Sequence, residues 1–379
     1  MKVLMLSTDK KIFDSTSEVR KRMIDYGAIF EELHIVVFTK QKTTNDKQQL
    51  TTINNNIWVY PTNSKFKFFY LWDTYKITKS SIVSRQLSII SCQDSFETGL
   101  VGWLLKLRFN LPLQLQVHTD IFSPYFWQES WKNKLQVLLA KFLLPRADGI
   151  RVVSERIKQS LKAKGLKLKN EPVVLPIFVD VKKIQSAKAK FNLHQKYPEY
   201  DFIILMASRL TKEKNIGMAI EAMKELSQRS NVKSKMLLLI VGDGSEREAL
   251  QKSIGKCQLS NVLIEPWTSD LVSYYKTADL FLLTSNYEGY GRTVIEAMAS
   301  GLPVIMSDVG LAGELLIDDL DGRVVSAGDE KALAAAIVEL KENPAKREEF
   351  KLNSLKLLEK WPAKKEYLEK YRNSLEMLK

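Results

Sequence analysis

A glycine-rich loop between two carboxylates marks residues 281–301, which read FLLTSNYEGYGRTVIEAMASG. The loop and its carboxylates are Glu288, Gly289, Tyr290, Gly291 and Glu296. A glycine-rich loop that leads into a helix N-terminus presents backbone N–H groups to an anion. Carboxylates beside such a loop suit neutral hydroxyl groups, such as those of ribose or of a sugar. The pattern therefore predicts a pocket for a nucleotide sugar.

Two basic residues follow a different predicted strand, at residues 202–208. Arg209 comes directly after this strand, and Lys214 comes five residues later. Fixed cations neutralise the charge that develops on a leaving diphosphate. Alone, two such residues are more typical of a solvated loop, so the prediction depends on the glutamates downstream. A glycosidase could also use paired carboxylates, but it needs no diphosphate cradle, so the cations favour transfer from an activated sugar.

These residues carry a resemblance to a known family. Residues 285–303 resemble the motif of the retaining GT-B glycosyltransferases of the family 4 type, in which two glutamates are separated by seven residues within a phrase such as SxxEGFGxxxxEAMAxGxPVI. Residues 208–215 resemble the family's GRLxxxKG element, with Ser208 and Asn215 in place of its two glycines. The resemblance implies that a donor, a UDP- or GDP-sugar, is bound by Arg209, Lys214, Gly242, Trp267, Glu288, Gly289, Tyr290, Gly291 and Glu296.

His118 ends a predicted strand, at residues 113–118, and polar residues follow it. The family places a histidine here, near the donor sugar and its phosphate, where a neutral imidazole or its cation could hydrogen-bond a hydroxyl. A core histidine with satisfied hydrogen bonds is the alternative. The resemblance implies that the catalytic residues are His118, Arg209, Lys214 and Glu288.

The acceptor site is predicted less directly, because the first predicted loop departs from the family pattern. The family commonly has two glycines there, whereas this chain has none before Gly27. Ser15 and Glu18 have the spacing of a capping box that opens a helix, and such a helix N-terminus could offer N–H groups to an anion. We expect the acceptor-site residues to be Ser17, Arg20 and Asp120.

A metal motif is weak in this sequence. Asp319 and Asp321 form an Asp-x-Asp pair, but Gly322 follows them, and this composition is typical of a turn. No other cluster in the sequence has the spacing of metal ligands. We therefore expect no required metal, and no cofactor apart from the sugar donor.

Apolar runs of strand length alternate with helical patterns along the whole chain. Predicted strands cover residues 3–7, 34–38, 57–60, 89–92, 113–118 and 150–154, and then 202–208, 236–241, 262–265, 281–284, 303–307 and 323–325. This alternation predicts an α/β protein with two parallel sheets. We expect an acceptor domain at 1–180 and a donor domain at 181–360, both Rossmann-like, with 361–379 packing back on the first. The resemblance implies that they face each other across a cleft.

Charge and composition limit the setting of the protein. Residues 1–180 hold 27 Lys+Arg against 16 Asp+Glu, a net of +11 out of the formal +13. An excess of this size favours an acidic partner: an anionic membrane, a phosphorylated acceptor or nucleic acid. The two cysteines are far apart in sequence, which suggests a reducing compartment. With no signal peptide or membrane span in the sequence, we expect a cytoplasmic protein.

Aromatic and basic residues alternate at 66–72 and 122–146, both within the basic half. Such stretches suit a membrane interface, although ordinary helix packing is equally compatible with them. We expect a peripheral enzyme on the inner face of the cell membrane, with a lipid-linked or cell-envelope glycan as acceptor. The alternatives are an inactive relative that binds sugar nucleotides and a basic nucleic-acid-binding protein. No nucleic-acid-binding motif is recognised, so we expect no nucleic acid partner.

Overall fold

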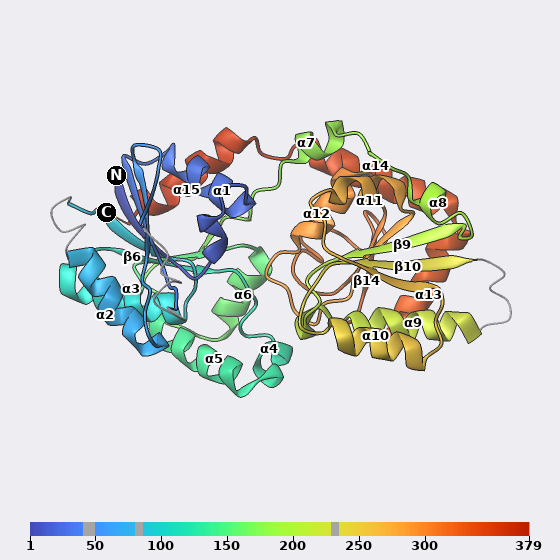
Figure 1. Cartoon of the computed structure of the whole chain (residues 1–379), viewed down its shortest axis with the longest axis horizontal. Helices are drawn as coiled ribbons and strands as arrows, with labels where there is room; N and C mark the ends of the chain where they lie inside the picture. Colours follow the sequence, from blue (N-terminus) through green and yellow to red (C-terminus); the bar gives the residue numbers. More distant parts are fainter. Residues whose placement is uncertain (41–49, 80–85, 229–234, 379) are drawn as a thin grey trace. The chain divides into compact units, whose positions relative to one another are not determined.

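The computed structural model describes residues 1–40, 50–79, 86–228 and 235–378 (Figure 1). The chain forms two compact units. The N-terminal unit combines Met1–Phe122, Ser130–Pro176 and Ala363–Lys379, and the C-terminal unit combines Ser123–Glu129 and Ile177–Pro362. Each unit is built around a parallel sheet with helices on both faces, as the alternation in the sequence predicts.

The N-terminal unit contains an eight-stranded sheet in the order β3-β4-β2-β1-β5-β6-β7-β8, in which only β3 is antiparallel to its neighbour. Its strands are β1 (Lys2–Ser7), β2 (Glu32–Val37), β3 (Thr51–Ile53), β4 (Ile57–Pro61), β5 (Ile89–Cys92), β6 (Leu113–Val117), β7 (Gly149–Val152) and β8 (Val173–Val174). Its helices are α1 (Glu18–Gly27), α2 (Tyr70–Ile77), α3 (Glu97–Phe109), α5 (Trp131–Leu143), α6 (Glu155–Ala163) and α15 (Lys364–Glu376). Short 3₁₀ turns are η1 (Lys10–Phe13), η3 (Lys67–Phe69) and η6 (Leu144–Arg146).

The C-terminal unit contains a six-stranded parallel sheet in the order β11-β10-β9-β12-β13-β14. Its strands are β9 (Phe202–Ala207), β10 (Met236–Val241), β11 (Val262–Glu265), β12 (Leu280–Leu283), β13 (Val304–Ser307) and β14 (Arg323–Val325). Its helical segments are α4 (Pro124–Glu129), α7 (Val181–Ser186), α8 (Leu193–Lys196), η7 (Lys212–Lys214), α9 (Ile216–Gln228), α10 (Arg247–Lys256), α11 (Leu271–Thr277), α12 (Arg292–Ala299), α13 (Glu330–Glu342) and α14 (Pro344–Leu358). In Figure 1, α9, α10 and α13 cover one face of this sheet, and α11 and α12 cover the other.

The strand order of the C-terminal unit determines where its ligand site should lie. Taken in chain order, the six strands follow the 3-2-1-4-5-6 arrangement of a Rossmann fold. The order reverses between β9 and β12, which pair in parallel. Loops that leave the carboxyl ends of two such strands diverge and leave a crevice, where ligands bind in open α/β sheets.

All twelve predicted strands are present, with ends that differ by one or two residues at most. Most of these strands are buried on both faces and rich in Val, Ile and Leu, which makes them easy to recognise in a sequence. The prediction missed β3 and β8, which are edge strands of three and two residues.

One segment of the first half belongs to the C-terminal unit. Helix α4 lies within the predicted domain 1–180, but its side chains contact residues of the C-terminal unit. The Tyr287 hydroxyl donates to Glu129 Oε2 (2.7 Å), and the rings of Phe126 and Tyr287 meet edge to face at 5.4 Å. The chain therefore leaves the N-terminal unit after β6 and re-enters it at α5.

Helix α15 belongs to the N-terminal unit, although it follows the C-terminal unit in sequence. The ring of Tyr371 stacks on Tyr26 of α1 at 4.4 Å, and Lys364 pairs with Asp25 at 2.8 Å. Trp361 still belongs to the C-terminal unit, where its indole N–H donates to the Val179 carbonyl (3.0 Å). The chain therefore crosses between the units just before α15.

Candidate active site

Two loops at the switch point of the C-terminal sheet are tied together by hydrogen bonds. We call residues 208–215, after β9, and residues 284–291, after β12, the switch-point loops. The Asn286 N–H donates to the Glu213 carbonyl (2.8 Å), and Asn215 donates from its amide to Asn286 Oδ1 (3.0 Å). The Thr284 hydroxyl donates to the carbonyl of Lys214 (3.0 Å). These contacts connect the two motifs found in the sequence.

A cation and a carboxylate meet where the loops join. The Lys214 ammonium group forms an ion pair with Glu288 Oε1, and both side chains are mostly buried. The Ser285 hydroxyl donates to the same oxygen (2.8 Å). On the same loop as Lys214, Arg209 pairs with Glu213 at 3.2 Å while 75% of its side chain is exposed. Thus one cation is held in place and a second is accessible to an anion.

Helix α12 begins directly after the glycine-rich loop. Gly291 is its N-cap with φ 97°, a left-handed conformation that glycine adopts without a steric penalty. Gly291 has no side chain with which to cap the helix, and a helix start of this kind is suited to an anion. Tyr290, between the two glycines, is buried.

Glu296 projects from the second turn of α12 and is largely buried. Its Oε1 accepts from Arg292 Nε (2.7 Å), and its Oε2 accepts from the Tyr275 hydroxyl (3.1 Å). Burial, followed by the nearby carboxylate, raises the pKa of Tyr275 well above its ordinary value, so this hydroxyl stays protonated as a donor. The carboxylate is thus oriented by protein donors in the structure.

Gly242 lets the loop after β10 approach the loop after β9. A Cβ at Gly242 would lie 1.9 Å from the Ser208 carbonyl oxygen, so no other residue fits without moving the backbone. The Leu210 N–H donates to the Asp243 carbonyl (2.9 Å), which joins the same two loops. Gly242 therefore shapes the switch-point loops through backbone packing.

Trp267 lies in the loop after β11 and is 65% exposed. Glu265, two residues earlier, is held by Lys196 (2.6 Å) and by the hydroxyls of Tyr197 and Tyr274. The strand end is thus fixed by a partly exposed polar cluster, and the indole of Trp267 beyond it remains accessible.

His118 and Asp120 lie in the N-terminal unit, in the loop after β6. His118 Nε2 is 2.9 Å from Gln116 Oε1. Burial, then the charges of Arg151 and Arg22, lowers the pKa of His118 to about 3, so its imidazole is neutral near pH 7. Asp120 accepts from the Ser160 hydroxyl (3.1 Å), and burial raises the pKa of its carboxyl group.

Ser17 caps α1, which corrects the predicted capping box at Ser15. The Ser17 hydroxyl accepts from the Arg20 N–H (3.1 Å) and donates to the Lys11 carbonyl (2.5 Å). The helix therefore begins at Glu18, two residues after the position that Ser15 would have set. Arg20 lies half-buried in the first turn of this helix.

Asp319 and Asp321 lie in a turn before β14. Asp319 adopts a left-handed conformation with φ 64° and pairs with Arg323 at 3.4 Å and with Lys346. The Asp321 carboxylate accepts from the Ile317 N–H (3.3 Å) within the turn. Within the described ranges, no group of three or more His, Cys, Asp or Glu side chains could hold a metal ion.

Several supporting residues were not predicted from the sequence. Ser285 was visible in the motif but was given no role, and it hydrogen-bonds Glu288. Tyr275 holds Glu296 from α11, and Tyr287 connects α4 to the loop of Glu288. These contacts join residues from separate elements, and no spacing in the sequence signals them.

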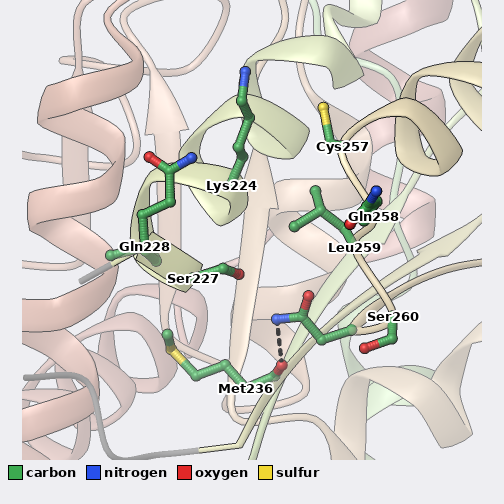
Figure 2. A pocket seen from close by; sticks show the side chains of 10 residues that line it. Lys224, Ser227, Gln228, Met236, Cys257, Gln258, Leu259 and Ser260 are labelled. Carbon is green, nitrogen blue, oxygen red and sulfur yellow. Dashed lines mark hydrogen bonds between the residues drawn. The ribbon is translucent and has the colours of Figure 1, made fainter. Parts of the chain in front are cut away.

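A hollow of about 440 Å³ in the C-terminal unit lies away from the switch-point loops (Figure 2). It is lined by the end of α9, the loop after α10 and the beginning of β10, where the Asn261 amide donates to the Met236 carbonyl (3.1 Å). Met236 is the first residue of its strand, whereas the candidate site lies at the strands' carboxyl ends. This hollow therefore lies at the end of the sheet where the strands begin, opposite the end that carries the candidate site.

Comparison with known proteins identifies the family of this chain. Residues 189–357 match the family model for glycosyl transferases group 1, and residues 56–176 match that for the glycosyl transferase 4-like domain. The uncharacterized glycosyltransferase MJ1178 of Methanocaldococcus jannaschii is 26% identical over 82% of this chain and 80% of its own length. Alpha-monoglucosyldiacylglycerol synthase of Streptococcus pneumoniae is 27% identical over 67% of this chain, which spans 59% of that relative.

Solved structures share the fold over the full length. The structure of HepE from Anabaena in complex with UDP aligns with a TM-score of 0.76, 19% identity and complete coverage of both chains. Fold and sequence together define a glycosyltransferase enzyme of the GT-B class, as predicted. The chain belongs to the family 4 type, the group 1 glycosyl transferases.

Proposed function

We propose that the protein is a retaining glycosyltransferase that transfers a sugar from a nucleoside diphosphate sugar to an acceptor hydroxyl. The observation that carries this proposal is the junction of the switch-point loops, where Lys214 pairs with Glu288. The exposed Arg209 lies on the same loop as Lys214, and the loop of Glu288 leads directly into the glycine-capped start of α12. Cations and helix N–H groups suit a diphosphate, and the carboxylates suit sugar hydroxyls.

The residues divide between the parts of the donor. Arg209, Lys214 and the backbone of Gly289–Gly291 would bind the diphosphate, and Glu288 would face the sugar. Glu296 would accept hydrogen bonds from the ribose hydroxyls, and Trp267, with the loop of Gly242, would flank the base. Support comes from HepE, whose structure contains UDP.

Unpaired polar atoms at the same edge add support. Four buried side-chain hydroxyls have no hydrogen-bond partner in the described part of the chain, and three of them belong to Ser208, Thr211 and Ser307. All three follow or end strands β9 and β13 at the carboxyl edge of the C-terminal sheet. Buried polar atoms without partners are rare in native proteins, so a polar ligand at this edge accounts for them.

The proposed chemistry retains the configuration of the sugar. The acceptor oxygen bonds to the anomeric carbon on the face from which the diphosphate leaves, while the bond from that carbon to the phosphate oxygen breaks. The acceptor proton passes to the departing phosphate oxygen. Arg209 and Lys214 stabilise the growing negative charge, which is the part that a divalent metal performs in other enzymes.

A donor screen in the presence of chelator tests this function. Each UDP- or GDP-sugar is added to the protein in EDTA, and thermal unfolding and transfer to a glycan or glycolipid acceptor are measured. A specific donor should raise the unfolding midpoint by mass action, and transfer should persist in EDTA with the anomeric configuration retained. Loss of transfer on chelation, restored by Mg²⁺ or Mn²⁺, would contradict metal independence. If the donor binds but is neither transferred nor hydrolysed, the protein would be an inactive relative that binds sugar nucleotides.

The acceptor is proposed to be lipid-linked or part of a cell-envelope glycan, because the N-terminal unit has an exposed apolar and basic face. One face of α5 is apolar and exposed, on the side of the helix away from its buried residues. Its side chains are 39–75% exposed and are those of Trp131, Leu135, Leu138 and Phe142. This face, which we call the α5 face, also exposes basic side chains, those of Lys132, Lys134, Lys141 and Arg146. Among the described residues, no helix is long and apolar enough to cross a bilayer. The α5 face suits an anionic membrane surface.

The full chain is therefore expected to sediment with phosphatidylglycerol vesicles, to be released by salt, and to ignore phosphatidylcholine vesicles. Each Lys or Arg near an anionic surface contributes about 1 kcal/mol within a Debye length of about 10 Å. The double variant Trp131→Ser/Leu138→Ser should lose most of this binding. Leu352→Ser, at an exposed leucine on α14, is the matched control. Trp127 lies on α4, in the C-terminal unit, and is outside the α5 face.

Two results would exclude this membrane contact. One is equal binding by the double variant and the native chain, and the other is equal binding to neutral vesicles. If DNA displaces the protein from the vesicles while free phosphate does not, the basic face would instead be assigned to nucleic acid.

A further inference from the structure

Strand β6 has a polar face inside the N-terminal unit. Its leucines face α3, where a Cβ added at Gly99 would lie 3.3 Å from the Leu115 side chain, and its glutamines face α15. Gln114 donates to the Ser374 carbonyl (3.1 Å), and Gln116 is 3.3 Å from the Tyr371 hydroxyl. Because side chains alternate along a strand, His118 continues the face of the two glutamines. The candidate histidine is thus the end of a buried polar row covered by the C-terminal helix.

The hydrogen bonds of Gln116 determine the tautomer of His118. The Gln116 oxygen accepts from Arg151 Nη1 (3.1 Å), and a guanidinium group has donors only. This contact fixes which end of the amide is oxygen, so His118 Nε2, 2.9 Å from the same oxygen, must carry its proton. The neutral imidazole therefore presents Nδ1 as an acceptor, and this atom makes no hydrogen bond within the described residues.

Arg151 is itself fixed by the rest of the unit. It is buried on β7, where Nε donates to the Leu175 carbonyl (3.1 Å) and Nη2 donates to the Tyr367 hydroxyl of α15 (3.0 Å). Its charge and that of Arg22 on α1 disfavour a second proton on His118. The charged side chains that act on the imidazole are both cations.

We infer that Gln116 and Arg151, held by Tyr367 of α15, position His118 as a neutral Nε2–H imidazole whose Nδ1 accepts a hydrogen bond from a sugar hydroxyl. The inference rests on the proposed function for the identity of the hydroxyl, and it decides between the two roles left open for this histidine. A neutral acceptor recognises an O–H group, whereas an imidazolium would recognise a phosphate oxygen. Gln116 and Arg151 are positioning residues, and they connect the C-terminal helix to His118.

Nitrogen-15 NMR of the histidine side chains in the full chain tests this directly. The chain has three histidines, so a His118→Gln variant assigns the signal. We expect the Nε2–H tautomer at pH 7 and no titration between pH 5 and 8. Titration within that range, or an Nδ1–H tautomer, would overturn the inference. This measurement needs no substrate, so it is independent of the proposed reaction.

Variants on β6 test the positioning. Gln116→Leu removes the acceptor of the Nε2 proton, so His118 should populate both neutral tautomers. The value of kcat/KM should fall about tenfold, in line with loss of a hydrogen bond. Gln116→Glu should raise the pKa of His118 into the range from pH 5 to 8, because a carboxylate favours the imidazolium. The control is Gln114→Leu, which disturbs the same face and helix without touching His118. If Gln114→Leu and Gln116→Leu change the His118 signal equally, the change comes from a general loss of packing in the N-terminal unit. That result would overturn the positioning role of Gln116.

The hydroxyl assignment has its own readout. For a neutral acceptor, kcat/KM should not fall as the pH rises from 5 to 8, whereas a required imidazolium would lose activity as it deprotonates. If NMR shows the Nε2–H tautomer but His118→Ala transfers sugar at the native rate, the tautomer assignment is retained. The proposed hydrogen bond to a sugar hydroxyl is then rejected. If His118 titrates while Lys214 variants are inactive, the proposed function stands and this inference falls.

Discussion

Lys214→Met is expected to lower the rate of sugar transfer by about 10²–10³-fold. The ammonium group lies where the switch-point loops join, pairs with Glu288, and belongs to a side chain that is only 14% exposed. A fixed charge in such a site stabilises a leaving diphosphate strongly, and removal of one such donor from an active site has an effect of this size. The measurement is kcat with the donor identified by thermal shift.

Two matched variants give this result its meaning. Lys212→Met removes an exposed cation from the same 3₁₀ turn and should change kcat less than about twofold. Because Lys214→Met leaves Glu288 without its cation, Lys214→Met/Glu288→Gln shows whether the unpaired carboxylate causes the loss. Lys212→Met and Lys214→Met variants of equal activity would remove Lys214 from the proposed mechanism.

Glu296→Ala is expected to weaken binding of the nucleoside diphosphate about tenfold or more. Hydrogen bonds from hydroxyls to a carboxylate contribute roughly 1.5–3 kcal/mol, and Glu296 is oriented for this by Arg292 and Tyr275. Calorimetry with the free nucleoside diphosphate measures the change without requiring an acceptor.

Tyr275→Phe separates binding from stability. This variant removes the hydroxyl that donates to Glu296 but keeps the carboxylate, so it should lower the unfolding midpoint slightly and leave donor affinity within about threefold of native. Unchanged affinity in Glu296→Ala would place Glu296 outside the donor site and leave it a structural role in α12.

The elements that position the candidate donor site could be predicted because their signals are local. Strands β9 and β12 are continuous apolar runs, and Glu288 and Glu296 lie within one contiguous phrase. The helix start at Ser17 was missed by two residues, because Ser15 and Ser17 are both suitable caps by residue type. The choice between them depends on the Lys11 carbonyl, which the 3₁₀ turn η1 brings near Ser17.

The missed features depend on contacts between distant parts of the chain. Two buried glutamines on β6, beside a buried arginine on the neighbouring strand β7, are unusual in a core. They are accommodated because Tyr367 and Tyr371 supply hydrogen-bond partners from α15. The docking of α4 depends likewise on Tyr287, 158 residues away from Glu129. Sequence periodicity reports which face of an element is apolar, but it does not report which element will cover a polar face.

The assembly of the N-terminal unit from three separate segments has a kinetic consequence. Tyr26 and Tyr367 share a hydrogen bond across 341 positions of the sequence, so the unit cannot bury its polar row until α15 has emerged and returned. Contacts of such long range slow folding, because chain entropy is lost before they form. The C-terminal unit uses only residues between Ser123 and Pro362, so during synthesis it can be complete while the N-terminal unit still exposes Gln114, Gln116 and Arg151. The histidine that follows this row would then acquire its fixed tautomer in the last step of folding.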